Sequence, residues 1–272
     1  MKHFEIPVAL PQGTEAKLYP YLLDNYDEID PNRKRPLVLV IPGGGYGEVS
    51  RREAEGVAVR FLAAGFHAAV LRYSITPAEF PQSLIELAFS VAYLREHAKE
   101  WAIDENKIVV AGFSAGGHLA ASLAVFWNQE WLWKELGLSG CQIKPNGLLL
   151  SYPVISSGKY RHENSFKNLL GKKDSPEMRE LVSLEKQVSA DVPPTFAWHT
   201  ITDPAVPVQN SILFTSALIE HGVSVEQHLF SIGDHALALA DEETMTVNNG
   251  RGIEKRCQPW LDLAIAWLRD LN

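Results

Sequence analysis

Short apolar runs alternate with segments of helical periodicity from about residue 36 onward. The first run, LVLVI at residues 37–41, is followed by Pro-Gly, which is typical of a strand buried on both faces of a parallel sheet. The first 35 residues indicate an antiparallel edge. Repeated strand, helix, strand units predict an α/β fold with a mostly parallel sheet and helices on both faces. The other predicted strands cover residues 68–71, 107–111, 147–152, 195–199 and 223–230.

Two pairs of residues predict where helices begin. Ser50 with Glu53, and Ser83 with Glu86, have the spacing of a capping box, in which the two side chains close the first turn of a helix. The first of these helices should end at Gly65, because glycine readily adopts the backbone conformation that stops a helix. Three further helices are predicted: one over residues 116–126, one that ends before Gly222, and one over residues 255–271.

The stretch between residues 153 and 193 shows neither the short apolar runs of the strands nor the periodicity of a helix, and it is polar and basic. We expect it to be a small cap insertion above the carboxyl ends of the strands, where open α/β sheets bind their ligands. No internal repeat or linker divides the sequence. Residues 1–272 are therefore predicted to form a single domain.

The composition narrows the range of partners. The formal net charge is -8, which disfavours binding to nucleic acid or to an anionic membrane. Two cysteines, Cys141 and Cys257, are too few for a disulfide framework. Neither a signal peptide nor an apolar stretch of about 20 residues is recognisable. We expect a soluble, cytoplasmic protein that binds a small molecule, and leave a homo-oligomer open.

A G-x-S-x-G motif at residues 112–116 lies between a predicted strand and a predicted helix. In this context Ser114 is a candidate nucleophile, since a tight turn with flanking glycines projects the serine from the sheet. Without that context the motif would indicate only a structural turn. A second glycine loop, PGGGYG at residues 42–47, follows an earlier strand. We assign the oxyanion hole to the amides of Gly44, Gly45 and Ala115, with a plain turn as the alternative.

Nine histidines are available for the base, and His235 is preferred because it follows the last predicted strand on a glycine-containing loop. His228 lies within that strand, and His118 lies in the helix after Ser114. Asp203 follows the preceding strand and is the candidate acid, with Asp234 as the rival. The order Ser114, Asp203, His235 is the one expected for this architecture.

These segments resemble α/β-hydrolases of the esterase/lipase group, which includes acetyl esterases and the bacterial acetyl-xylan and feruloyl esterase-like proteins. The resemblance covers residues 15–271 and rests on residues 42–46, 112–118, 198–200, 203–207 and 234–235. Two departures are visible: Pro42 replaces the histidine of a His-Gly-Gly motif, and Ala236 follows the base where glycine is frequent. The resemblance implies an α/β-hydrolase fold and a short acyl group, in particular acetyl on a sugar or xylo-oligosaccharide.

Trp127, Trp131 and Trp133 could stack on sugars, but packing against the core or the cap is the favoured interpretation. The sequence has no metal-binding motif, so neither a metal nor a cofactor is expected.

The function hypothesis is a serine carboxylesterase that hydrolyses a small-molecule ester. A prolyl-type peptidase would share the fold and triad, although this sequence shows no propeller-like domain. A non-catalytic binding protein on the same fold would usually lack a triad member, and this sequence has candidates for all three.

Overall fold

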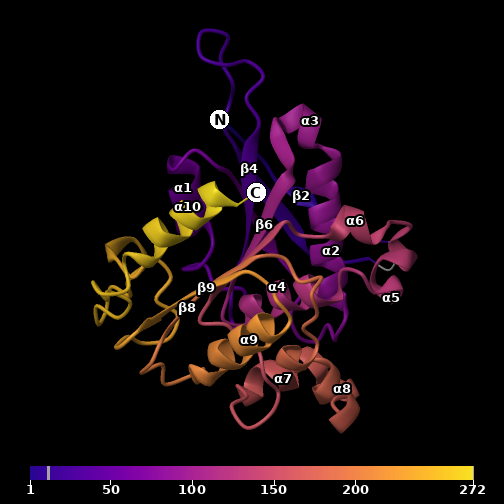
Figure 1. Ribbon diagram of the computed structural model, residues 1–272, viewed down its shortest axis with the longest axis vertical. Helices are drawn as coiled ribbons and strands as arrows, with labels where there is room; N and C mark the ends of the chain where they lie inside the picture. Colours follow the sequence, from indigo (N-terminus) through magenta and orange to yellow (C-terminus); the bar gives the residue numbers. More distant parts are fainter. Residues whose placement is uncertain (11–12, 272) are drawn as a thin grey trace.

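In the computed structural model, which describes residues 1–10 and 13–271, a nine-stranded mixed sheet runs through the molecule (Figure 1). Its order is β1-β3-β5-β4-β6-β7-β8-β9, with β2 also paired to β3. Neighbouring strands in the part β5-β4-β6-β7-β8-β9 are parallel, whereas β3 is antiparallel to β1, β2 and β5. The predicted parallel sheet with an antiparallel edge is confirmed. The strands are β1 (Lys2–His3), β2 (Ile6–Pro7), β3 (Lys17–Leu22), β4 (Arg35–Ile41), β5 (His67–Arg72), β6 (Ile103–Phe113), β7 (Gly147–Ser151), β8 (Thr195–Thr200) and β9 (Val225–Phe230).

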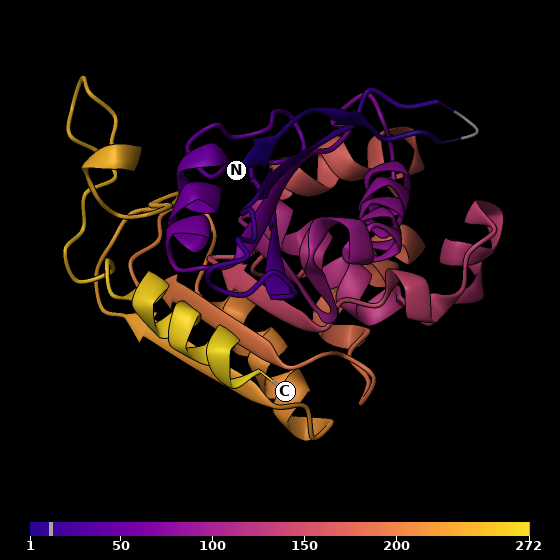
Figure 2. The same ribbon diagram turned by 90° about the horizontal axis from the view of Figure 1, so that it is seen from above.

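Helices cover both faces of this sheet, as predicted (Figure 2). Side chains of α1 and α10 pack on one face, and those of α2, α4 and α9 pack on the other. The helices are α1 (Glu55–Ala63), α2 (Gln82–Glu96), α3 (Ala98–Trp101), α4 (Ala115–Phe126), α5 (Glu130–Trp133), α6 (Gly140–Ile143), α7 (Glu163–Leu170), α8 (Pro176–Leu181), α9 (Gln209–Glu220) and α10 (Trp260–Asp270). Short 3-10 turns are η1 (Lys134–Leu136), η2 (Gly171–Lys173), η3 (Leu184–Lys186) and η4 (Glu242–Thr244).

The central strand β4 shows why its sequence is an unbroken apolar run. Leu37, Leu39 and Ile41 belong to the core on the α2 and α4 side, while Val38 and Val40 belong to the core on the α1 and α10 side. Alternate side chains of a strand point to opposite faces, and all five of these are completely buried. Burial on both faces therefore explains the absence of polar positions.

The two predicted capping boxes are wrong. Helix α1 begins after Ala54 and α2 after Pro81, and neither has a side-chain cap. Glu53 and Glu86 are buried instead, because their carboxylates bind groups that are distant in the sequence. The last helix begins at Trp260 rather than at residue 255, since Pro259 cannot occupy the interior of a helix.

The segment from residue 153 to residue 193 contains α7 and α8, which lie together below α9 in Figure 1. Trp127 and Trp133 pack against the core, as expected, and Trp127 Nε1 also donates to the carbonyl of Asp191 in this segment at 3.0 Å. Trp131 packs against Phe80 and Phe126, and Lys144 Nζ lies 4.4 Å from the ring centroid of Trp127.

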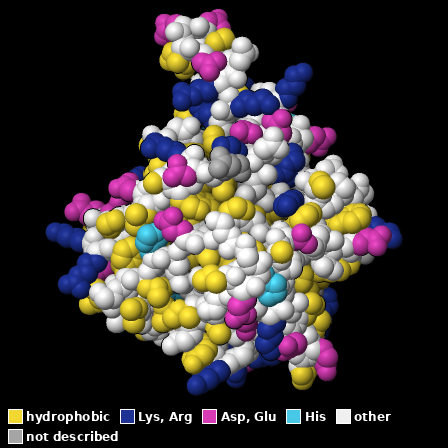
Figure 3. Space-filling model, in the orientation of Figure 1, with side chains coloured by type: hydrophobic (Ala, Val, Ile, Leu, Met, Phe, Trp, Pro, Cys, Tyr) yellow, Lys and Arg dark blue, Asp and Glu magenta, His cyan; other side chains and the backbone are white. Residues whose placement is uncertain are grey.

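Strand β9 forms the edge of the sheet beyond β8. Its residues are half-buried or exposed, and Leu229 is 40% exposed. Figure 3 shows hydrophobic side chains on the part of the surface where β8 and β9 lie in Figure 1. The last parallel strand is thus the least covered one.

Strand β4 and the turn after β6 approach each other so closely that only glycine fits between them. A Cβ added to Gly116 would lie 2.1 Å from the carbonyl oxygen of Ile41, and one added to Gly43 would lie 2.8 Å from Cβ of Ser114. Such distances are far below van der Waals contact. The two glycine loops of the sequence are therefore packed backbone against backbone.

Gly116→Ala should destabilise the protein by about 3 kcal/mol or more, because a methyl group facing a backbone carbonyl forces the two loops apart. Gly56→Ala in α1 is the matched control, since the nearest atom to its Cβ would be Glu243 Cγ, at an ordinary contact distance of 3.5 Å. That variant should change stability by no more than about 1 kcal/mol. Urea denaturation measures both, and equal free energies of unfolding would contradict the packing argument.

Candidate active site

Ser114 occupies a strained turn between β6 and α4. Its φ of 52° and ψ of -118° place a non-glycine residue in a region that L-amino acids rarely adopt. The turn is held from both sides, because its amide donates to the carbonyl of Ser151 and its carbonyl accepts from the amide of Val154, each at 3.0 Å. Backbone strain retained in this way is typical of a functional position.

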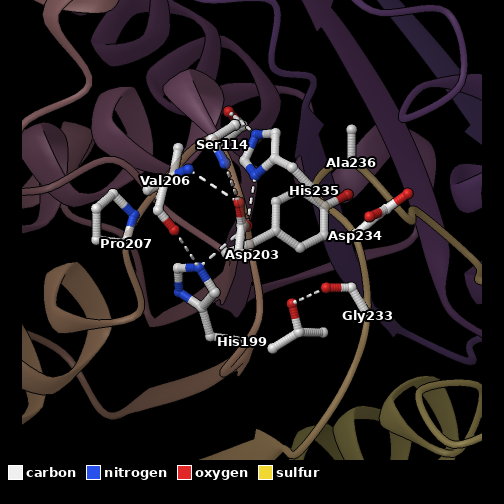
Figure 4. Close-up of polar contacts among 12 residues, drawn as sticks. Ser114, His199, Asp203, Val206, Pro207, Gly233, Asp234, His235 and Ala236 are labelled. Atoms are coloured by element: carbon white, nitrogen blue, oxygen red, sulfur yellow. Dashed lines mark hydrogen bonds and ion pairs between the residues drawn. The ribbon is translucent and has the colours of Figure 1, made fainter.

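The structure brings Ser114, His235 and Asp203 into one chain of hydrogen bonds (Figure 4). Ser114 Oγ lies 2.8 Å from His235 Nε2, and His235 Nδ1 lies 2.6 Å from Asp203 Oδ2. An ionised carboxylate only accepts hydrogen bonds, so Nδ1 carries the ring proton and Nε2 accepts from the serine hydroxyl. The three residues come from the loops after β6, β8 and β9.

Asp203 is surrounded by donors. Its side chain is fully buried, and its Oδ1 accepts from the amides of Ala205 and Val206 at 2.8 and 2.9 Å. Burial alone would raise the pKa of this carboxyl. Hydrogen bonds from His199 and His235 outweigh burial and hold the pKa below its ordinary value. Asp203 is therefore a carboxylate at neutral pH.

His199 is a member of this cluster that the sequence analysis did not single out. Its Nε2 lies 3.0 Å from the carbonyl oxygen of Val206 and 3.2 Å from Asp203 Oδ2. Both groups are acceptors, so Nε2 carries a proton and donates to them. The spacing of four residues between His199 and Asp203, across the end of a strand, is the signal that could have indicated it.

The rival residues lie elsewhere. Asp234 is directed away from the triad in Figure 4, and its carboxylate is 3.5 Å from Arg251 Nε. His118 is fully buried, where its ring contacts the hydroxyl of Tyr46 and the carbonyl of Val182. His228 is 2.7 Å from Glu226. None of these three side chains is hydrogen-bonded to Ser114 or His235.

The amides of Gly44, Gly45 and Ala115 are free to bind an oxygen. Among the residues that the structure describes, no acceptor is bonded to any of these three N–H groups. Gly44 and Gly45 line the same pocket as Ser114, and Ala115 is the first residue of α4. The N-terminus of a helix also carries partial positive charge, which favours an oxyanion.

Glu53 connects the glycine loop with the loop that carries the base. This 1%-exposed carboxylate accepts from the amide of Gly43 at 2.8 Å and from the hydroxyl of Tyr152 at 2.7 Å. Tyr152 in turn accepts from the amide of Ala238, and its ring lies edge-on to that of His235 with centroids 5.0 Å apart. One buried acid therefore fixes both walls of the site.

The pocket above Ser114 is small, and most of the side chains that line it are polar. Its volume is about 450 Å³. Besides Ser114, His235 and residues of the loop from Gly44 to Glu53, its lining includes His162, Asn164, Asn168 and Ala236. None of the three tryptophans lines this pocket. A larger open hollow of about 1050 Å³, bordered by residues 72–79 and 171–173, contains no triad residue.

Within residues 1–10 and 13–271, no group of three or more His, Cys, Asp or Glu side chains is arranged to hold a metal ion. In the same residues, no helix combines the length and the apolar character that crossing a membrane requires.

The fold and the hydrogen-bonded triad define a class, the serine carboxylic ester hydrolases of the α/β-hydrolase fold. The profile of one family, BD-FAE, matches residues 23–218. The chain belongs to the BD-FAE family.

Individual relatives agree with this membership. Endo-1,4-beta-xylanase B of Butyrivibrio fibrisolvens is 39% identical over 220 residues, which are 77% of this chain and 34% of that protein. The acetyl ester-xyloside bifunctional hydrolase of Caldicellulosiruptor lactoaceticus is 34% identical, with a TM-score of 0.82 over 98% of this chain and 96% of that one. The carboxylesterase Cest-2923 of Lactobacillus plantarum WCFS1 is 27% identical, with a TM-score of 0.88 over 99% and 98%. The chain spans well under half the length of the first curated relatives that it matches.

Asp203→Asn should reduce turnover of an acetyl ester by a factor on the order of 10⁴, because an amide at this position favours the wrong histidine tautomer. Asp234→Asn removes the same charge outside the triad and should change kcat less than about threefold. Both variants are compared by initial rates on p-nitrophenyl acetate. If Asp234→Asn were the more damaging substitution, the acid would be misassigned.

Glu53→Gln should lower kcat about tenfold and leave KM nearly unchanged, because the amide has one acceptor oxygen for the two donors of Gly43 and Tyr152. Glu86→Gln is the matched control. Glu86 is equally buried but binds Ser74, away from the pocket. Both variants should have lower melting temperatures, yet only Glu53→Gln should lose kcat at a temperature where both are folded. Equal kcat values would contradict the role of Glu53.

Proposed function

We propose that this protein is a carboxylesterase that removes short acyl groups, in particular acetyl, from sugars or xylo-oligosaccharides. The observation that carries the proposal is the lining of the pocket above Ser114. Its non-catalytic side chains are histidine, asparagine, serine and glutamate, and Ala236 is the largest apolar one. Such a lining suits hydroxyl groups and has no large apolar side chain to pack against a long acyl chain.

In the proposed reaction, His235 Nε2 takes the proton of Ser114 while Oγ attacks the ester carbonyl. Asp203 keeps the proton of the ring on Nδ1 and stabilises the imidazolium that forms. The negative charge on the former carbonyl oxygen is bound by the amides of Gly44, Gly45 and Ala115. Backbone donors held by the fold would need little reorganisation when this charge develops.

The tetrahedral intermediate then collapses. The bond between the carbonyl carbon and the alcohol oxygen breaks, and His235 donates its Nε2 proton to the leaving alcohol. Water, deprotonated by the same nitrogen, attacks the acyl-enzyme, and the proton returns to Ser114 Oγ as the acid leaves. These reaction steps use only groups of the protein, the substrate and water. That the enzyme needs no metal or cofactor stays a prediction.

The names of two relatives support a substrate that contains a sugar, and one of them also names an acetyl ester. The Caldicellulosiruptor lactoaceticus enzyme is an acetyl ester-xyloside hydrolase, and the Butyrivibrio fibrisolvens protein is a xylanase. The cytoplasmic location expected from the sequence stays a prediction, and it would imply substrates that have been imported.

On p-nitrophenyl esters, kcat/KM should fall at least about tenfold from acetate to octanoate. The pocket has no large apolar side chain to cover the octanoyl chain, which therefore stays exposed to water. Ser114→Ala should abolish hydrolysis of every ester in the series, since only the nucleophilic oxygen is removed. Circular dichroism of that variant checks that the fold is retained. A higher kcat/KM for octanoate than for acetate would contradict the short-acyl proposal, and activity in Ser114→Ala would contradict the nucleophile.

A further inference from the structure

Helix α7 and the residue before it contribute three polar side chains to the pocket of Ser114. His162 precedes the first residue of α7, and Asn164 and Asn168 follow within the helix. Asn164 and Asn168 are four residues apart and lie on one face of the helix. This group comes from the segment between β7 and β8, far from the triad in sequence.

The ring of His162 is fixed by a buried hydroxyl. Its Nδ1 lies 2.8 Å from Ser165 Oγ, and Ser165 is 1% exposed. Among the described residues, this nitrogen is the single acceptor bonded to that hydroxyl. The hydroxyl proton therefore points at Nδ1, which leaves the ring proton on Nε2.

The Nε2–H group of His162 is available to a ligand. In the described part of the chain it has no hydrogen-bond partner, and it is not a buried unsatisfied atom. Burial and the nearby His235 lower the pKa of His162, so the ring is neutral at neutral pH and acts as a donor of fixed direction.

The asparagines complete the group chemically. Asn168 Nδ2 donates to the carbonyl of Gly45 at 2.9 Å, which ties α7 to the oxyanion loop. Asn164 is exposed, and its side chain has no hydrogen-bond partner among the described residues. Its amide supplies both a donor and an acceptor. A sugar carries neighbouring hydroxyls that each donate and accept, so it matches this set better than an aromatic or aliphatic alcohol.

We propose that His162, with Asn164, forms the subsite for the hydroxyl groups of the alcohol part of the ester. The inference rests on the function proposed above and assigns its substrate recognition to α7. His235 gives its proton to the leaving alcohol, so the alcohol lies beside His235. His162 borders both this residue and Gly45. A hydroxyl next to the ester would accept a hydrogen bond from His162 Nε2.

The test compares two esters with the same acyl group, acetylated xylobiose and p-nitrophenyl acetate, which has no sugar hydroxyl. His162→Ala should lower kcat/KM for acetylated xylobiose about tenfold, as expected for one lost hydrogen bond in a pocket, and change that for p-nitrophenyl acetate less than about twofold. His162→Gln should recover part of the loss, because Gln Nε2 can replace the donor. His221→Ala, at the exposed end of α9, is the matched control.

Unesterified xylobiose gives a second measurement, as a competitive inhibitor of p-nitrophenyl acetate hydrolysis. Its inhibition constant should rise about tenfold in His162→Ala and stay constant in His221→Ala. Equal losses on both esters would show that His162 only supports the pocket and would overturn the inference, as would no loss on either. A wild-type enzyme that hydrolyses p-nitrophenyl acetate but no acetylated sugar would refute the sugar substrate and this subsite together. A wild-type protein that hydrolyses none of these esters would instead refute the proposed function itself.

Discussion

The close approach of two backbone loops determines the rest of the site. The loop after β4 carries two of the amides proposed for the oxyanion hole, and the turn after β6 carries Ser114. Gly43 and Gly116 allow these loops to touch without side chains between them. Because the proposed donors are backbone amides of the same contact as Ser114, their position relative to Ser114 does not depend on side-chain rotamers. The remaining groups of the site, Glu53 and His235, bind to this contact from outside.

Much of the fold follows from the sequence because strands and turns are local features. The apolar run of β4 and the motif around Ser114 predicted the elements on either side correctly, since burial on two faces and a strand-to-helix turn each leave a local pattern. The acid and base were placed by chain order after their strands, and the structure brings Asp203 rather than Asp234 to His235. The cap interpretation of residues 153–193 stays a prediction, although α7 does line the pocket.

Glu53 and Glu86 show what a local pattern cannot resolve. A serine followed three residues later by a glutamate has the same spacing whether the acid caps a helix or is buried in a distant network. Glu53 binds Tyr152, which is 99 residues away, and only tertiary packing decides between the two roles. His199 differs, since its partners Asp203 and Ser211 are only four and twelve residues further along the chain. Long-range polar contacts therefore explain the errors at Glu53 and Glu86 but not the omission of His199.

The position of β9 has a consequence for how the protein loses function. His235 follows this edge strand, whose residues are half-buried or exposed, whereas Ser114 and the glycine loop follow central strands. Edge elements open more readily than the core of a sheet. Opening of β9 alone would withdraw the base and leave the nucleophile and oxyanion donors in place. Activity therefore depends on the edge of the sheet, and it can be lost while most of the protein stays folded.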